Sequence, residues 1–162
     1  MKLKPDFLLV GDDLAHGHGP FVSPQDFRDL FMPRYRILAE EITCPWIFHS
    51  DGNLLPIMDD LLSLGMAAIH PIEPYGMDIL EVKKRYGDRV VLVGNVDMNI
   101  IANGTPEDID RQVQWLADNV GRSGGWILSS SNSIDSGANP KNVIAMGKAL
   151  SKYGVRDGKE QR

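Results

Sequence analysis

Residues 45–53 read PWIFHSDGN, a continuous apolar run that changes abruptly into a polar turn. Apolar runs without alternation are typical of strands that are buried on both faces, as in a parallel sheet. The same pattern recurs elsewhere in the chain. The runs that we predict to be parallel strands cover residues 7–10, 45–48, 66–69, 90–93 and 126–128.

Helical segments separate the predicted strands, and capping residues mark where they start. Ser23, Thr105 and Asn139 each precede a proline, which places an N-cap side chain before a proline at the first helical position. Pro33 interrupts the segment 25–42, which we expect to be kinked or split there. The alternation predicts an α/β protein with a parallel sheet and helical crossovers. A closed eight-stranded barrel needs about 250 residues, so the pattern fits either an open doubly wound sheet or an incomplete barrel.

Composition narrows the class of protein. With 162 residues and 43% hydrophobic composition, the chain can bury the core of one domain. The net charge of -5 and the absence of a long basic run argue against nucleic acid or an anionic membrane as the partner. The single cysteine, Cys44, cannot form an internal disulfide, and no signal peptide or membrane-spanning run is visible, so we expect a cytoplasmic protein. We expect one domain over residues 1–154 and a disordered tail over residues 155–162.

Polar residues gather directly after the predicted strands, at the edge where α/β proteins bind their ligands. The strand-end sequences are GDDLAHGHG (11–19), HSDGN (49–53), HPIE (70–73), GNVD (94–97) and SSSNS (129–133). All four histidines of the chain lie in these sequences. The opposite strand ends carry nothing comparable, so we predict a functional site at the carboxyl ends of the strands.

Two pairs of residues are the first candidates for this site. Asp12 and Asp13 suit an acid/base or metal site, because paired carboxylates at this face build such sites, although they could instead cap their own loop. His49 and Asp51 lie two residues apart and point to the same side if the strand continues, so they could share a metal ion or form a hydrogen-bonded pair. In the alternative interpretation, Asp51 only fixes the turn at Gly52.

Other polar residues at this edge have structural explanations. Those of a strand-end histidine and a solvated turn are favoured for His70 and Glu73, whereas Asn95 and Asp97 fit either ligands or a turn cap. The five strand-end loops, residues 11–23, 49–54, 70–78, 94–104 and 129–139, nevertheless contain no Lys or Arg. Their carboxylates are Asp12, Asp13, Asp51, Glu73, Asp78, Asp97 and Asp135. Such an acidic surface favours a metal ion or a cationic group.

Taken together and in this order, the strand-end motifs resemble those of one enzyme superfamily. The motifs are Asp12-Asp13, FVSP at 21–24 with Phe27 and Pro33, HSDG at 49–52, VGNVD at 93–97, GGWIL at 124–128 and NPxNVxAM at 139–146. From Phe7 to about Tyr153 the chain resembles the C-terminal portion of the uroporphyrinogen decarboxylase superfamily, which includes tetrapyrrole decarboxylases and corrinoid-dependent methyltransferases. The resemblance implies a (βα)8 TIM barrel, and therefore an incomplete barrel of about five C-terminal βα units here.

The resemblance also implies site residues, and at these positions the sequence departs from the family. In the methyltransferases a zinc ion is held by His-x-Cys and a later Cys, and the matching positions look like His49, Asp51 and, by approximate alignment, Asn132. Both sulfur ligands are absent, which puts a thiol acceptor in doubt but leaves nitrogen and oxygen ligands for a metal. In the decarboxylases a histidine near the last strand contacts substrate, and Asn132 stands at that position too. Their essential aspartate and substrate-binding arginines come from the N-terminal part of the barrel.

The first functional hypothesis is an enzyme of one-carbon chemistry at a tetrapyrrole-linked or corrinoid-linked site, with metal-assisted methyl transfer ahead of decarboxylation because the loops are acidic. Zinc or another divalent ion at His49 and Asp51 would act as a Lewis acid. Asp97 and Asn132 would complete or orient its ligands, and Asp12-Asp13 would bind substrate. Cofactor-free decarboxylation of a tetrapyrrole carboxylate is one alternative. A non-catalytic, truncated or split half-barrel that needs a partner chain is the other.

An incomplete barrel also predicts association. A parallel arc leaves two free edges and one uncovered apolar face, and burying such surface stabilises a complex by about 25 cal/mol per Å² of apolar area. We therefore expect a homo-oligomer, or a partner that supplies the missing strands, and not a compact monomer. The expected ligand is a small-molecule substrate, with a corrinoid as substrate or partner cofactor if the reaction is methyl transfer.

Overall fold

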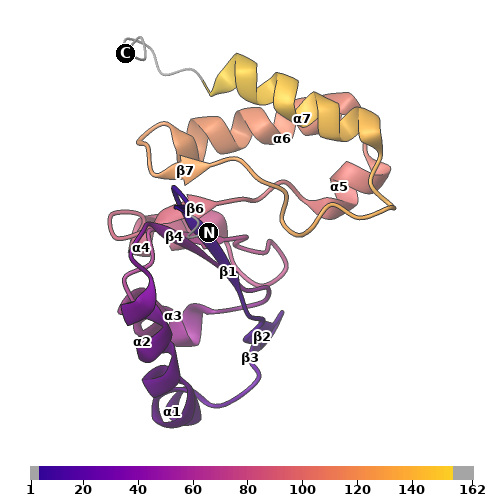
Figure 1. Ribbon diagram of the computed structural model, residues 1–162. Coiled ribbons are helices and arrows are strands. Elements are labelled where there is room, and N and C mark those ends of the chain that lie inside the picture. The colour runs from indigo at the N-terminus through magenta and orange to yellow at the C-terminus, as the bar shows by residue number, and fades with distance from the viewer. Residues whose placement is uncertain (1–3, 155–162) are drawn as a thin grey trace.

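The computed structural model describes residues 4–154, which are organised by one parallel sheet (Figure 1). Its five strands are β1 (Leu8–Gly11), β4 (Trp46–His49), β5 (Ala68–His70), β6 (Val91–Val93) and β7 (Trp126–Ile127), and their order in space is their order along the chain. Every neighbouring pair is parallel. The predicted α/β fold with five parallel strands is confirmed, whereas the tail predicted over residues 155–162 lies outside the described residues.

Helices connect the strands as crossovers. They are α1 (Pro24–Asp26), α2 (Met32–Glu41), α3 (Met58–Leu62), α4 (Ile79–Tyr86), α5 (Met98–Asn103), α6 (Pro106–Leu116) and α7 (Pro140–Tyr153), with short π or 3-10 turns η1 (Phe27–Phe31), η2 (Leu55–Ile57) and η3 (Ala117–Gly121). The N-caps act as the sequence predicts: the side chains of Ser23, Thr105 and Asn139 each accept a backbone N–H of the first turn. Pro33 lies in the first turn of α2, and the π turn η1 precedes it, so the segment changes helical geometry before the proline.

The sheet does not close into a barrel within the described residues. β1 and β7 are its two edges, and each pairs with one neighbour only among residues 4–154. On these edges the side chains of Leu9 and Ile127 are 65% and 48% exposed. Helices α6 and α7 pack against each other near β7, and α1 and α2 lie on the far side of the molecule (Figure 1). The arrangement is a partial (βα)8 barrel whose edge strands carry exposed apolar side chains.

Buried side chains hold the strand ends in place. Phe48, Ile69 and Leu92 occupy neighbouring strands of the sheet and are fully buried. Burial of side chains of this size stabilises the fold by roughly 1.5–3 kcal/mol each. Asn142 of α7 is also fully buried, and its amide Nδ2 donates to the carbonyl oxygens of Ile101 at 3.0 Å and Gly104 at 2.8 Å, which ties α7 to the end of α5. The frame around the strand ends is therefore well packed.

A short antiparallel hairpin lies over the carboxyl ends of the strands, and the sequence did not predict it. Its strands are β2 (Ala15–His16) and β3 (Gly19–Pro20). The hairpin approaches the turn after β4, where the Asn53 backbone N–H donates to the His16 carbonyl at 2.9 Å. Gly52 makes this approach feasible, because its φ is +82° and a Cβ there would lie 2.5 Å from the Ala15 carbonyl carbon. No helix of residues 4–154 is long and apolar enough to cross a membrane.

Candidate metal centre at the strand ends

Four predicted residues meet where the strands end. His49 is the last residue of β4, Asp51 follows in the next turn, Asp13 lies after β1 and Asn132 after β7. The strand register explains this convergence, since Gly11 of β1, His49 and His70 of β5 lie side by side at the same level of the sheet. Side chains from separate parts of the chain therefore reach one point.

The Asp13, His49 and Asp51 side chains form a compact cluster of nitrogen and oxygen atoms. The His49 Nε2 lies 3.8 Å from Asp13 Oδ1 and 4.0 Å from Asp51 Oδ1. One potential ligand atom from each of the three residues lies within 4.8 Å of the other two. The Asp51 backbone N–H also donates to Asp13 Oδ1 at 3.1 Å, which fixes the two loops relative to each other. These separations are of the size that a single cation between the three side chains would span.

Asn132 and a buried oxygen single out Asp51 within this cluster. The Asn132 side-chain amide donates to Asp51 Oδ2 at 2.8 Å. The second oxygen, Asp51 Oδ1, is buried and has no hydrogen-bond partner among residues 4–154. A buried carboxylate oxygen without a partner is costly, because its interaction with water is lost and not replaced. Since this oxygen faces His49 Nε2, the residues fit a cation bound between them.

His49 continues into a second set of contacts on its other side. Its Nδ1 lies 2.7 Å from His70 Nδ1, and the His70 Nε2 lies 3.2 Å from the Ser129 hydroxyl. Burial and the neighbouring His49 lower the pKa of His70, while Asp51 acts in the opposite direction. The His70 ring is therefore held in its neutral form around pH 7.

Asp12 is directed to different partners from its neighbour Asp13. Its Oδ2 accepts a hydrogen bond from the Tyr35 hydroxyl of α2. Burial of Tyr35, together with the hydrogen bond and the charge of Asp12, raises the pKa of the phenol far above its usual range. The tyrosine thus stays protonated and remains a donor, and the carboxylate links the end of β1 to α2.

Asn95 and Asp97 follow β6 and have structural partners of their own. The buried Asn95 amide donates to the Ile72 carbonyl at 2.7 Å. Asp97 caps α5 by accepting the Asn99 backbone N–H at 2.8 Å, and it accepts the Tyr75 hydroxyl at 3.1 and 3.2 Å. Their contacts are those of turn and helix caps, one of the two interpretations that the sequence left open.

Comparison with known proteins gives this arrangement a family. The family model described as "Uroporphyrinogen decarboxylase (URO-D)" matches residues 5–153. The chain belongs to the URO-D family. A uroporphyrinogen decarboxylase of Pseudoalteromonas translucida is 22% identical over 148 residues, which cover 85% of this chain and 40% of that protein. A methylcobamide:CoM methyltransferase of Methanosarcina barkeri is 29% identical over 91 residues, or 56% of this chain and 26% of that enzyme.

A solved structure has the same fold. A methyltransferase from Methanosarcina mazei superposes with a TM-score of 0.78 and 22% sequence identity, covering 93% of this chain and 43% of that one. The described residues therefore share the fold of part of that protein. The chain spans about two fifths of the length of the first relatives it matches.

Two further residues contact the cluster. His70 is hydrogen-bonded at the end of its strand, as one interpretation of the sequence expects, and its partner is His49. Glu73 has a role that the sequence does not predict, since its Oε2 accepts the Gly52 backbone N–H at 2.7 Å and so holds the turn that carries Asp51. For His70 the sequence offered one signal, because the residue lies beside His49 in the strand register. For Glu73 it offered none, because only the fold brings its loop next to the turn at Gly52.

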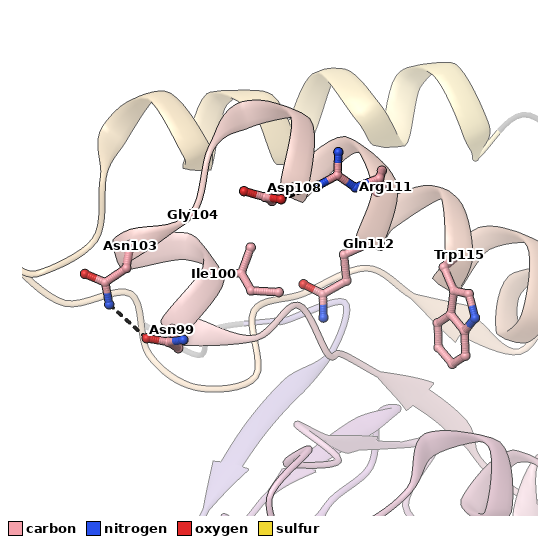
Figure 2. A pocket seen from close by; sticks show the side chains of 8 residues that line it. All are labelled: Asn99, Ile100, Asn103, Gly104, Asp108, Arg111, Gln112 and Trp115. Carbon is pink, nitrogen blue, oxygen red and sulfur yellow. Dashed lines mark hydrogen bonds and ion pairs between the residues drawn. The ribbon is translucent and has the colours of Figure 1, made fainter.

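A separate cavity of about 560 Å³ lies on the outer helices (Figure 2). Its lining residues come from α5, α6 and the turn between them, namely Asn99, Ile100, Asn103, Gly104, Asp108, Arg111, Gln112 and Trp115. The side chains of Asn99 and Asn103 hydrogen-bond to each other at its rim. No residue of the strand-end cluster lines this cavity, so the two features are distinct.

Proposed function

We propose that this chain provides the metal-binding part of a URO-D-family methyltransferase, with a divalent ion held by Asp13, His49 and Asp51. The observation that carries the proposal is the buried oxygen Asp51 Oδ1, which lies 4.0 Å from His49 Nε2 and has no hydrogen-bond partner in the part of the chain that the structure describes. A carboxylate oxygen in this position interacts favourably with a cation that the histidine nitrogen also binds. The absence of Lys and Arg from the strand-end loops supports a cation over an anion.

The donor set decides which ions suit the centre. Three protein ligands with a further open position are typical of catalytic zinc sites. Two carboxylates and one imidazole form a harder set than the His-x-Cys and Cys ligands expected of the methyltransferases, so harder ions such as Mn²⁺ compete with Zn²⁺. Bound there, the ion would supply Lewis-acid activation of an acceptor. Asn132 would orient Asp51 through its 2.8 Å hydrogen bond.

The proposed reaction is methyl transfer involving a corrinoid, as substrate or as the cofactor of a partner protein. Support comes from the relative named as a methylcobamide:CoM methyltransferase and from the acidic centre. Because Asp51 and Asn132 stand where cysteines are expected, we propose an acceptor other than a free thiol. In this reaction Asp12 and Asp97 would act through the loops that they hold.

Decarboxylation of a tetrapyrrole carboxylate is the second candidate, and one observation favours it. Two relatives named uroporphyrinogen decarboxylase, both from Pseudoalteromonas, align over 85% of this chain, against 56% for the methylcobamide:CoM methyltransferase. This reaction would need cationic groups for the substrate carboxylates, and the strand-end loops carry none. Those groups would have to come from the other barrel strands.

We also propose that β1 and β7 pair with further βα units that complete the barrel, supplied by the same polypeptide, a partner chain or a second copy. The exposed Leu9 and Ile127 on these edges are the reason. In the third alternative, the half-barrel has no activity until such units are present. Light scattering on the purified chain should show a species larger than a monomer, and a stable monomer that unfolds cooperatively would contradict this proposal.

Metal content measures the proposed function directly. We expect purified protein, exposed to Zn²⁺ and then dialysed, to retain about one ion per chain by elemental analysis. His49→Ala and Asp51→Ala should abolish retention. His18→Ala, at an exposed histidine of the same face, and Asp88→Asn, at the opposite end of the sheet, should not. Retention that is lost in the control variants or kept in the cluster variants would contradict the proposal.

A further inference from the structure

We propose that His70 is a positioning residue that sets the ring tautomer of His49, so that the Nε2 lone pair of His49 faces the carboxylates of Asp13 and Asp51. The direction of the tautomer rests on the proposed function. The coupling between the two rings stands on the hydrogen bonds alone. The position of His70 in the sequence does not by itself indicate a role in metal binding, so the inference depends on the contacts described below.

The contact between the two histidines requires a choice of tautomer. Their Nδ1 atoms are 2.7 Å apart, and the two rings are tilted by 34° with their centroids 4.9 Å apart. Nitrogen atoms at this distance share one hydrogen, so one ring donates and the other accepts. A neutral imidazole has one donor and one acceptor nitrogen. The role that Nδ1 takes in this contact therefore also decides whether Nε2 of the same ring donates or accepts.

The proposed metal centre decides the direction. A histidine nitrogen that binds a metal ion carries no hydrogen, so a His49 that binds through Nε2 carries its hydrogen on Nδ1. The His70 Nδ1 is then the acceptor of the shared contact. The hydrogen of the His70 ring lies at Nε2, where the Ser129 hydroxyl accepts it at 3.2 Å.

The hydrogen on the shared contact must then belong to His49. Its Nδ1–H donates to His70 Nδ1, and its Nε2 carries a lone pair directed at the cluster. That lone pair lies 3.8 Å from Asp13 Oδ1 and 4.0 Å from Asp51 Oδ1. In the metal-bound centre the cation lies between this lone pair and the two carboxylates. The relay from Ser129 through His70 accepts the Nδ1–H of His49 and so favours the tautomer that can bind the ion.

The fold holds this relay rigidly. His49 and His70 are paired in the register of β4 and β5, and Ser129 follows β7. Both rings are partly buried, so water competes less for their nitrogen atoms. Contacts of this kind to a metal-binding histidine change metal affinity by about 10-fold to 100-fold when they are removed.

Two measurements on the same ¹⁵N-histidine-labelled protein test the inference: ring tautomers from long-range ¹H–¹⁵N spectra, and the Kd for Zn²⁺ from competition with a chelator. We expect His49 to carry its hydrogen on Nδ1 and none on Nε2 when Zn²⁺ is bound. In His70→Ala we expect a mixture of His49 tautomers and a Kd raised about 10-fold to 100-fold. His70→Asn, whose side-chain oxygen can accept from His49, should restore most of both properties. His16→Ala is the matched control and should change neither.

Ser129→Ala provides a second test that leaves both rings in place and does not depend on how His70→Ala folds. It should raise the Kd by a smaller factor than His70→Ala. A His49 hydrogen on Nε2 in the Zn²⁺-bound parent protein, or unchanged tautomer and Kd in His70→Ala, would overturn the inference. Tautomer control by His70 without any Zn²⁺ binding would support the inference on positioning while refuting the proposed metal function.

Discussion

Replacing Asp51 with asparagine should make the metal-free protein no less stable and the metal-bound protein less stable. In the folded chain the carboxylates of Asp13 and Asp51 lie within one cluster whose ligand atoms are no more than 4.8 Å apart. Two unit charges at 4.8 Å repel by about 0.9 kcal/mol in water and by about 3.5 kcal/mol at an effective dielectric constant of about 20. Because Asp13 is 57% exposed, the lower value, about 1 kcal/mol, is appropriate.

Asparagine keeps the shape of aspartate and removes this repulsion. Its side-chain oxygen can still accept the Asn132 amide, although a neutral acceptor forms a weaker hydrogen bond than a carboxylate does. The two effects partly cancel, so the free energy of unfolding in the presence of a chelator should be unchanged or rise by up to about 1 kcal/mol. The variant would then lack the penalty that the partnerless oxygen imposes on the parent protein.

Zn²⁺ should reverse the order of stability. At a free concentration of 100 times its Kd, the ion stabilises the parent protein by about 2.7 kcal/mol. If Asp51→Asn weakens binding about 100-fold, the same concentration stabilises the variant by only about 0.4 kcal/mol. Urea unfolding of both proteins, with chelator and with Zn²⁺, measures the crossing, and Asp88→Asn serves as the control. Equal stabilisation of variant and parent by Zn²⁺, or a loss of more than about 2 kcal/mol without metal, would refute the reasoning.

Three further variants test the frame around the centre. Asn142→Ala should lower the free energy of unfolding by about 2 kcal/mol, because it leaves buried carbonyl oxygens at the end of α5 without a donor; urea unfolding measures this. Leu9→Lys should raise the dissociation constant for association about 10-fold or more by sedimentation, whereas Ile37→Lys on α2, at a side chain that is 64% exposed, should not. Gly52→Ala should weaken Zn²⁺ binding and cost more stability than Gly65→Ala, since both have φ of +82° but only Gly52 has backbone atoms within 3 Å of the new Cβ.

The sequence was sufficient to predict the sheet and the meeting point of its strand ends. Continuous apolar runs marked each strand, and the carboxyl ends of parallel strands must lie at one edge, so Asp13, His49 and Asp51 could be expected near one another. Asn132 came from the family resemblance and contacts Asp51 as a side chain that orients it. These are inferences from backbone direction, which short-range patterns determine well.

Side-chain direction within the loops could not be predicted in the same way. Asp12 and Asp13 are adjacent, yet Asp12 faces Tyr35 on α2 and Asp13 faces His49, a difference that depends on where α2 packs. The β2–β3 hairpin and the role of His70 likewise depend on contacts between loops far apart in the sequence. Such contacts are set by tertiary packing, and a single sequence carries no direct signal for them.

The most direct test of the proposed metal centre is anomalous diffraction from a crystal grown with Zn²⁺, with data collected above and below the zinc absorption edge. We expect one strong anomalous peak about 2.0–2.2 Å from His49 Nε2 and from a carboxylate oxygen each of Asp13 and Asp51. A peak at other residues only, such as the exposed His16 and His18, would contradict the account. So would the absence of a peak at the cluster in a crystal grown with excess Zn²⁺.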